Sequence, residues 1–252
     1  MLITINGKNL YAEHHNEFKN RPTIVFLHDS LGCVELWRDF PKKIADACQY
    51  NILIYDRLGY GKSDTMSTSN RPVNYLELEA VVLDHILENL NIQDAILFGH
   101  SDGGSIALIA AAKYQNRVKG VICEAGHIFV EEITLKGIHE AVHAYQNTNL
   151  SIKLQKYHGD KTETIFKAWA ETWLRDDFRN WNIEHLLPEI KCPLLFIQGE
   201  NDEYGTLHQV ERTIELVKGK SEKQIIPNTG HTPHKEASDS VIEKIKAFTA
   251  NF

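Results

Sequence analysis

The 252-residue sequence predicts an α/β fold, a mostly parallel central sheet with helices on both faces. Three observations support this prediction: short runs of β-forming apolar residues recur, helix-forming segments separate most of them, and polar loops follow the runs. Apolar runs without polar alternation are typical of strands that are buried on both faces. In such sheets the chemistry collects beyond the carboxyl ends of the strands, where these loops fall.

The expected elements follow one another in a regular order along the chain. The first fifteen residues form two strands around Asn6-Gly7, a hairpin signal. The expected buried strands are 23–27, 50–55, 95–98, 118–123, 193–197 and 224–226. The expected helices are 36–49, 73–90, 105–114, 206–218 and 233–252. Within the second helix, Leu76, Ala80 and Leu83 lie on one apolar stripe.

The alternation breaks between the strand at 118–123 and the strand at 193–197. Residues 126–187 contain several helical runs and no convincing strand, so we expect a helical lid inserted into a core of residues 1–125 and 188–252. The underside of a lid is the roof of a pocket. We therefore expect some aromatic residues of the insertion to contact substrate, while the others pack in the core. The expected pocket residues are Leu31, His100, Phe129, Trp169 and Trp173.

Composition excludes several classes of partner. The formal net charge of -7 argues against nucleic acid or an anionic membrane as the main partner. No apolar run approaches the roughly 18 residues that span a bilayer, and the start lacks the basic n-region of a secretory signal. The four cysteines are scattered without zinc spacing. We expect a cytoplasmic protein, a monomer or homodimer, that acts on a small molecule.

The segment 99–103 reads Gly-His-Ser-Asp-Gly, a G-x-S-x-G pattern between an expected strand and an expected helix. Where this pattern joins a strand to a helix, the turn is tight and the serine projects above the sheet. There it lies near a helix N-terminus, which favours negative charge. Ser101 is therefore a candidate nucleophile. The alternative is that Ser101 only caps the helix.

A nucleophilic serine needs a base, and the base needs an acid that fixes its tautomer. Asp202 follows the strand at 193–197 and His231 follows the strand at 224–226, so both should lie at the same edge of the sheet as Ser101. Their order along the chain, Ser-Asp-His, is typical of one hydrolase fold. Asp202 is also a plausible turn residue, and Glu200 or Glu124 remain alternatives for the acid.

These motifs together resemble the α/β-hydrolase superfamily over nearly the whole chain. The segments that carry the resemblance are His28 with its glycine-bearing loop, 56–63, the elbow at 99–103, 199–202 and 230–231. The resemblance implies an oxyanion hole made by the backbone N–H groups of Ser30 and Asp102, and no cofactor or metal. Epoxide hydrolases and dehalogenases of this superfamily usually place aspartate at the elbow, so Ser101 argues against both activities.

Two positions depart from the common pattern of the superfamily. Asp29 stands where glycine usually follows the first histidine, and Asp102 stands where an apolar residue often follows the nucleophile. Aspartate tolerates unusual backbone angles, so the loop at Asp29 can keep its shape. We expect the Asp102 carboxylate to cap the helix. The alternative is that it disfavours anionic substrates.

A second motif lies inside the insertion. Residues 139–143 read His-Glu-Ala-Val-His, the H-E-x-x-H pattern of zinc peptidases. A catalytic zinc needs a third protein ligand, and Gln146 and Asn149 stand where the extended motif has glycine and histidine. We interpret the pattern as the polar face of a lid helix.

The sequence thus predicts a serine hydrolase that cleaves a small ester, thioester or related acyl compound. The alternative within the fold is a C–C bond hydrolase acting on a vinylogous diketone through the same Ser101, Asp202 and His231. A hydrolase fold that only binds a ligand is a third reading.

Overall fold

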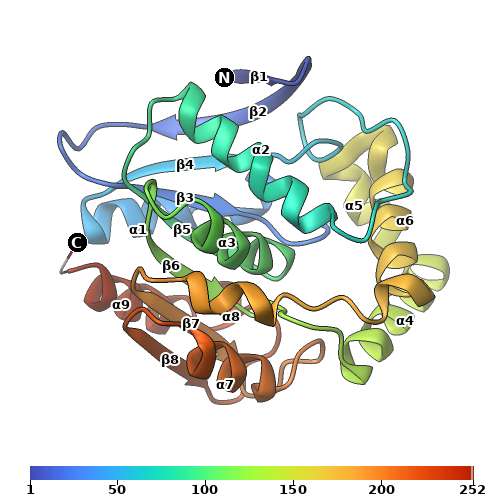
Figure 1. The fold of residues 1–252 in the computed structure, drawn as a ribbon. Helices are drawn as coiled ribbons and strands as arrows, with labels where there is room; N and C mark the ends of the chain where they lie inside the picture. Colours follow the sequence, from blue (N-terminus) through green and yellow to red (C-terminus); the bar gives the residue numbers. More distant parts are fainter. Residues whose placement is uncertain (251) are drawn as a thin grey trace.

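A computed structural model, which describes residues 1–250 and 252, contains one eight-stranded sheet in the order β1-β2-β4-β3-β5-β6-β7-β8 (Figure 1). The strands are β1 Leu2–Ile5, β2 Lys8–His15, β3 Thr23–Leu27, β4 Asn51–Tyr55, β5 Ala95–His100, β6 Val118–Glu124, β7 Leu194–Gly199 and β8 Ser221–Ile226. β2 pairs antiparallel with β1 and β4. The neighbouring strands in the row β4-β3-β5-β6-β7-β8 pair in parallel. The prediction of a mostly parallel sheet is confirmed.

Helices cover both faces of the sheet. Those of the core are α1 Phe40–Cys48, α2 Tyr75–Asn89, α3 Asp102–Lys113, α7 Leu207–Leu216, α8 Pro233–Glu236 and α9 Ser238–Thr249. α2 and α3 lie side by side on one face, and α1 packs with α9 on the other (Figure 1). No helix in the described part of the chain is both long and apolar enough to cross a membrane.

The two helical layers explain why the central strands lack polar alternation. Val25 and Leu97 belong to the hydrophobic cluster under α2 and α3, whereas Ile24 and Ile96 belong to the cluster under α1 and α9. All four side chains are fully buried. Because successive residues of a strand point to opposite faces, a strand covered on both sides must be apolar at every position.

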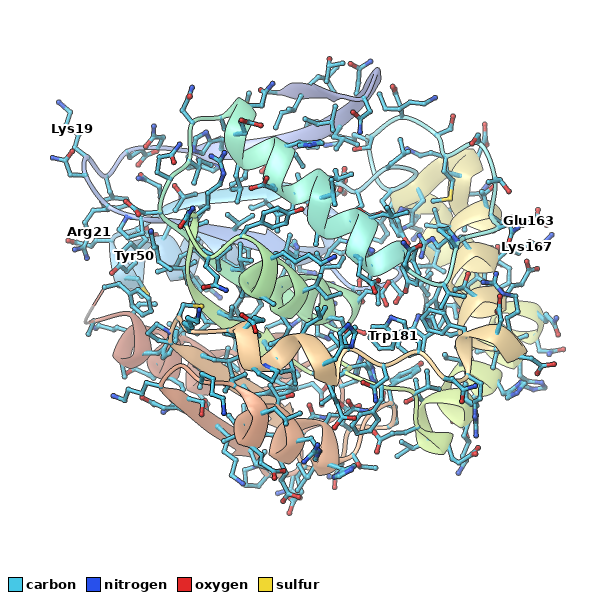
Figure 2. The ribbon with its side chains drawn as sticks, in the orientation of Figure 1. Lys19, Arg21, Tyr50, Glu163, Lys167 and Trp181 are labelled. Atoms are coloured by element: carbon cyan, nitrogen blue, oxygen red, sulfur yellow. The ribbon has the colours of Figure 1, made fainter. Side chains whose placement is uncertain are left out.

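A helical insertion lies between β6 and β7 and is coloured light green to orange in Figure 1. Its three α-helices lie beyond the carboxyl ends of the strands, whereas its last 3-10 segment packs against α3 and α7. Its helices are α4 Glu132–Asn147, α5 Leu150–His158 and α6 Thr162–Trp173, with the 3-10 segments η2 Gly159–Lys161, η3 Asp176–Phe178 and η4 Glu184–Glu189. Trp181 points inward, where the insertion meets the core, whereas Glu163 and Lys167 lie on the outer surface (Figure 2).

Polar contacts attach the middle of the insertion to the core. The Lys161 ammonium donates hydrogen bonds to the carbonyls of Gly61 and Ser63, each at 2.6 Å. The His158 ring donates to the Leu31 carbonyl at 3.0 Å through Nε2 and accepts from the Gly61 N–H at 3.1 Å through Nδ1. α5 and α6 are therefore tied to the loops that follow β3 and β4.

Two of the five expected helices, 73–90 and 206–218, differ from α2 and α7 by at most two residues at each end, and the other three differ by more. The helix expected at 36–49 is divided into η1 Val34–Trp37 and α1, because Arg38 has a φ of 53° that no helix continues through. The one expected at 233–252 is divided into α8 and α9 at Ala237, and its residue 251 lies outside the described residues. α3 begins at Asp102 rather than at residue 105, because Gly103 and Gly104 adopt helical conformation in its first turn.

Candidate active site

Ser101 occupies a sharp turn between β5 and α3, with φ of 55° and ψ of −120°. The turn needs glycine on both sides. A Cβ on Gly99 would lie 2.0 Å from the Gly103 carbonyl oxygen, and a Cβ on Gly103 would lie 2.0 Å from the Leu27 carbonyl oxygen. The Ser101 side chain makes no capping hydrogen bond to α3, so the alternative that it only caps the helix is wrong.

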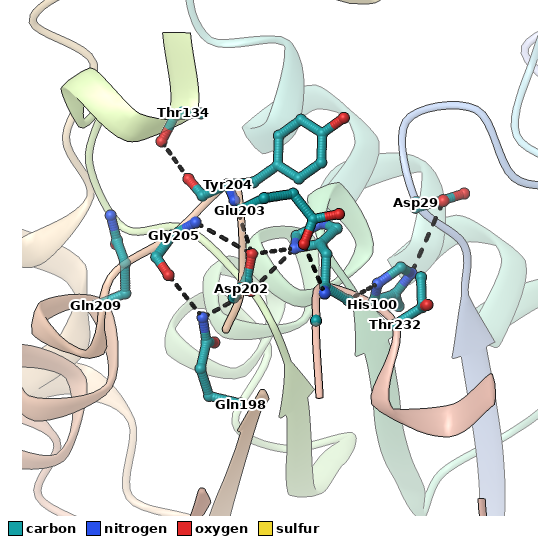
Figure 3. Close-up of polar contacts among 12 residues, drawn as sticks. Asp29, His100, Thr134, Gln198, Asp202, Glu203, Tyr204, Gly205, Gln209 and Thr232 are labelled. Atoms are coloured by element: carbon teal, nitrogen blue, oxygen red, sulfur yellow. Dashed lines mark hydrogen bonds and ion pairs between the residues drawn. The ribbon is translucent and has the colours of Figure 1, made fainter. Parts of the chain in front are cut away.

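Asp202 and His231 are hydrogen-bonded to each other. His231 Nδ1–H donates to Asp202 at 2.8 Å (Oδ1) and 3.0 Å (Oδ2). The carboxylate also accepts hydrogen bonds from Gln198 Nε2 at 2.7 Å and from the backbone N–H groups of Tyr204 and Gly205 (Figure 3). The sequence analysis gave Asp202 two possible roles, a turn residue and the acid that orients His231. In the structure it does both.

The pair perturbs the pKa of both groups. Burial alone would raise the pKa of Asp202, but the charge and the hydrogen bond of His231 hold it below its ordinary value. Burial would lower the pKa of His231, but the Asp202 carboxylate and its hydrogen bond raise it above the ordinary value. Since only Nδ1 contacts Asp202, the Nε2 of a neutral His231 is the basic nitrogen.

Ser101 and His231 line one pocket of about 210 Å³ at the carboxyl ends of the strands. Its other lining residues are Asp29, Ser30, Leu31, Asp102, His127, Thr134, Ile138, Trp169, Trp173, Glu203, Tyr204 and Thr232. Within the described chain no hydrogen bond joins Ser101 to His231 directly. Catalytic hydrogen bonds are often long before a substrate is bound, so this geometry is compatible with proton transfer.

The backbone amides of Ser30 and Asp102 are available at the same pocket. Both residues line it beside Ser101. Among the described residues, no backbone carbonyl accepts a hydrogen bond from either amide. The N–H of Asp102 begins α3, so the positive end of the helix dipole acts at this point. An oxyanion formed at Ser101 would find two unused donors.

The Asp102 side chain does not cap α3, and this expectation is wrong. Its Oδ2 accepts a hydrogen bond from Tyr75 OH at 3.0 Å and lies 3.5 Å from Arg57 Nη1. Trp173 Nε1–H in turn donates to Tyr75 OH at 2.9 Å. Arg57 is fully buried. A buried carboxylate needs such partners, and they draw Asp102 away from the helix end.

Two of the five expected pocket residues lie outside the pocket, whereas Leu31, Trp169 and Trp173 line it. The His100 side chain points behind the elbow, where Nε2–H donates to the His231 carbonyl at 2.8 Å. Phe129 lies past the end of β6, in a bridge to Asn182, and its ring contacts His208 on the surface.

Neither alternative acid contacts His231. Glu124, at the end of β6, accepts a hydrogen bond from His234 Nδ1–H at 2.5 Å, and both residues are buried. Glu200 accepts from the Asn228 backbone N–H. Asp202 is therefore the carboxylate that this fold presents to His231.

The residues of the H-E-x-x-H pattern do not form a metal site. His139, Glu140 and His143 are exposed on α4, the polar helix face that the sequence analysis favoured. In the part of the chain that the structure describes, only His100, Glu124 and His234 bring three potential ligands together. Two of those three are already hydrogen-bonded to each other, and the third to the His231 carbonyl.

The sequence analysis missed His127. This residue follows β6 and lines the pocket with an almost completely buried side chain. The rule that selected Asp202 and His231, a polar residue just beyond a buried strand, applies equally to His127 and would have found it.

Comparison with known proteins identifies the family. The model of the alpha/beta hydrolase fold family matches residues 22–180. The chain belongs to this family and is a hydrolase, as the resemblance implied.

Relatives of known sequence and structure extend the match to nearly the whole chain. The human serine hydrolase BPHL is 26% identical over 94% of this chain and 81% of its own. A 2-hydroxy-6-oxononadienedioate/2-hydroxy-6-oxononatrienedioate hydrolase of Escherichia coli strain K12 is 25% identical over 97% and 92%. The structure of MGS-M2, an alpha/beta hydrolase from a deep-sea metagenome library, gives a TM-score of 0.79 at 22% identity and covers 99% of this chain and 97% of its own. The enol-lactonase of Burkholderia xenovorans LB400 gives 0.77 at 18% identity and covers 99% and 100%.

Proposed function

We propose that this protein is a serine hydrolase that cleaves a small ester, thioester or related acyl compound through an acyl-enzyme. The single observation that carries the proposal is the hydrogen-bonded pair of Asp202 and His231, whose imidazole lines the same pocket as Ser101 at its tight turn. The helical insertion acts as a lid, because Thr134, Ile138 and the two tryptophans that line the pocket belong to it.

The reaction uses side chains of this chain and one water molecule. Ser101 Oγ attacks the acyl carbon, and its proton passes to Nε2 of His231. The amides of Ser30 and Asp102 hold the oxygen that becomes negative. The tetrahedral intermediate collapses, the bond to the leaving group breaks, and His231 returns the proton to that group. Water then attacks the acyl-enzyme by the same steps and releases the acid.

C–C bond cleavage is the second candidate, because the relative from Escherichia coli acts on two dioates by its name. The pocket argues against substrates of that charge. Asp29, Asp102 and Glu203 line it, and no lysine or arginine of the described chain does. Arg57 already pairs with Asp102, so a substrate with two carboxylates would meet the carboxylates of Asp29 and Glu203 and no lysine or arginine in the lining to pair with. We therefore favour the acyl compound.

The test is turnover of p-nitrophenyl esters, acyl thioesters and vinylogous diketones by wild type and Ser101→Ala. We expect wild type to hydrolyse a member of the first two groups, and the variant to lose a factor of about 10⁴ or more. A fluorophosphonate should label Ser101 in wild type. Ser240→Ala, which removes an exposed hydroxyl on α9, is the matched control and should keep full activity. Turnover that survives in Ser101→Ala would refute the mechanism.

A further inference from the structure

A fully buried arginine, Arg57, contacts two residues that line the pocket. It follows β4 and is 0% exposed. Its Nη2–H donates a hydrogen bond to the Asp29 carbonyl at 2.8 Å, and its Nη1 lies 3.5 Å from Asp102 Oδ2. A buried charge is costly unless it is paired, and breaking such a pair is strongly destabilising. The two contacts therefore constrain the residues that make them.

The Asp29 carbonyl belongs to the peptide whose N–H is that of Ser30. It accepts hydrogen bonds from Arg57 Nη2–H, from the His28 ring at 2.8 Å and, across the turn, from the Gly32 N–H at 3.3 Å. In a planar trans peptide the C=O and the N–H point in opposite directions. Donors gathered on the carbonyl therefore fix the orientation of this peptide and direct the Ser30 N–H away from Arg57.

The tautomer of His28 follows from the same contacts. Its Nε2 accepts a hydrogen bond from the Arg57 backbone N–H at 3.1 Å, so the ring proton is on Nδ1, which donates to the Asp29 carbonyl. Burial lowers the pKa of His28 well below its ordinary value, and the charge of Arg57 lowers it further, so the ring is neutral. The side chain of Arg57 thus holds the carbonyl directly, and its backbone holds it through His28.

The other contact of the guanidinium reaches the elbow. Asp102 Oδ2 accepts from Tyr75 OH at 3.0 Å and faces Arg57 Nη1. The Asp102 N–H begins α3, and no backbone carbonyl of the described chain accepts a hydrogen bond from it. A guanidinium is planar and rigid. One such group therefore contacts the peptide that carries the first expected donor of the oxyanion hole and the side chain of the residue that carries the second.

We propose that Arg57 is the positioning residue of the oxyanion hole, and that it sets the direction of the Ser30 N–H and its spacing from the Asp102 N–H. The guanidinium also polarises the peptide, because hydrogen bonds in a chain strengthen one another. Arg57 itself is fully buried and acts through these two residues. Its effect belongs to the transition state, in which the oxygen becomes negative. This inference rests on the proposed acyl transfer at Ser101.

The test variant is Arg57→Lys, because an ammonium group lacks the planar fork that reaches both partners. Activity is measured with the best ester or thioester of the panel. Inhibition is measured with the trifluoromethyl ketone and the methyl ketone of the same acyl chain. Ser101 Oγ adds to the trifluoromethyl ketone, its proton passes to His231 and the carbonyl oxygen becomes the oxyanion, whereas the methyl ketone binds without adding.

The expected loss lies in the transition state alone. In Arg57→Lys, kcat should fall by about 10- to 100-fold while KM changes by less than about twofold, because one misplaced donor weakens the oxyanion hole. The inhibition constant of the trifluoromethyl ketone should rise by the same factor, and that of the methyl ketone should stay within about twofold. An equal rise in both inhibition constants would mean a deformed pocket and would overturn the inference.

Arg71→Lys is the matched control. Arg71 is also buried and donates to Tyr60 OH at 2.7 Å, and the guanidinium of Arg57 lies 4.8 Å from the centre of the same ring. In the described chain no hydrogen bond or ion pair joins Arg71 to Asp29 or Asp102. Arg71→Lys should therefore lower the melting temperature but keep kcat and the ratio of the two inhibition constants. If it lowered kcat as Arg57→Lys does, the assignment to Arg57 would be wrong.

A second variant covers the case in which Arg57→Lys does not fold. Arg57→Met combined with Asp102→Leu replaces the ion pair by apolar side chains, so no buried charge is left unpaired and the protein should fold. Its kcat should still fall by about 10-fold or more, because the Asp29 carbonyl has lost a donor. Wild-type kcat in either folded variant would overturn the role of Arg57 alone. Wild type that is neither active nor labelled by a fluorophosphonate would overturn the acyl transfer itself.

Discussion

At the scale of single residues, the backbone of Ser101 carries a local conformational cost. Its φ of 55° and ψ of −120° lie outside the regions that L-residues favour, a cost of about 1–3 kcal/mol. The surrounding chain enforces the conformation, because the Ser101 N–H donates to the Glu124 carbonyl at 2.9 Å and its carbonyl accepts from Gly104 at 2.8 Å. The strained turn keeps the hydroxyl in the pocket.

The pair of Asp202 and His231 predicts a particular pH dependence. The base must be neutral to accept the Ser101 proton, and Asp202 holds the pKa of His231 above its ordinary value of about 6.5. Activity should therefore be complete above that raised pKa and fall as the pH drops through it. In Asp202→Asn the midpoint of kcat/KM should move to lower pH, and the rate above it should drop by about 10⁴-fold. The measurement is kcat/KM against pH for the best ester of the panel.

Glu200→Gln is the control for this change. Glu200 lies two residues before Asp202 and contacts Asn228 rather than His231. Its profile should coincide with that of wild type. An unchanged midpoint in Asp202→Asn would show that another group sets the acid limb.

The residues that sequence reasoning placed correctly are those fixed by strand ends. Ser101, Asp202 and His231 each follow a buried apolar run, and the chain direction of a parallel sheet brings such ends to one edge. His127 obeys the same rule, but the sequence analysis did not apply it there. Phe129 could not be placed, because the bridge to Asn182 that turns it outward depends on the fold of the whole insertion.

At the scale of elements, the central strands were easier to predict than the helix ends, whereas the edge strand β8 begins three residues before the expected 224–226. β3 has the expected bounds, since Thr23 and the four apolar residues after it, between polar loops, allow little else. The break at Ala237 between α8 and α9 has no glycine or proline to mark it. Just before the break, Glu236 turns back to accept hydrogen bonds from the N–H groups of Gly230 and Thr232.

Another contact between elements joins β6 to α8 beneath the site. Glu124 accepts from His234 at 2.5 Å, and His100 at the end of β5 donates to the His231 carbonyl at 2.8 Å. The hydrogen bond between Glu124 and His234 therefore anchors α8, the helix that follows the His231 loop. Burial would raise the pKa of Glu124, but the charge and hydrogen bond of His234 hold it below the ordinary value.

Glu124→Gln should destabilise the fold by about 2 kcal/mol, because a buried hydrogen bond to a charged group is replaced by a neutral one. The sign of the pH dependence follows from the lowered pKa. The stabilisation is present above the unfolded-state pKa of about 4.3 and is lost as the pH falls through the folded-state value. The difference between wild type and variant should thus be large at pH 7 and shrink in acid. Urea unfolding at several pH values measures it.

Glu243→Gln is the matched control, since Glu243 is exposed on α9. It should change the free energy of unfolding by less than about 0.5 kcal/mol at every pH. If the two variants were equally stable at pH 7, the buried pair would not anchor α8.

At the scale of the whole molecule, the pocket and the protein are both negatively charged. The formal net charge is -7, and the pocket is lined by Asp29, Asp102 and Glu203 without a lysine or arginine from the described chain. The Arg57 side chain near Asp102 is fully buried and donates to the Asp29 carbonyl at 2.8 Å, so it does not offer a charge to the open rim. A negative pocket in a negative protein repels anionic substrates before and after they enter.

This charge distribution predicts that an anionic ester is a poor substrate. Monomethyl succinate and dimethyl succinate have nearly the same shape and differ by one carboxylate. At low salt, kcat/KM for the monoester should be lower by about 10-fold or more, from repulsion of 1–2 kcal/mol at a half-solvated site. Raising the salt from about 0.01 M to 0.15 M shortens the Debye length from about 30 to 8 Å, so the difference in kcat/KM between the two esters should narrow.

Two variants test whether this difference comes from the pocket. Glu203→Gln, at the exposed rim, should narrow the difference in kcat/KM, whereas Glu211→Gln, an exposed change on α7, should leave it unchanged. A monoester hydrolysed faster than the diester at low salt would mean that a cation reaches the pocket, and it would favour C–C cleavage of dioates over the acyl compound.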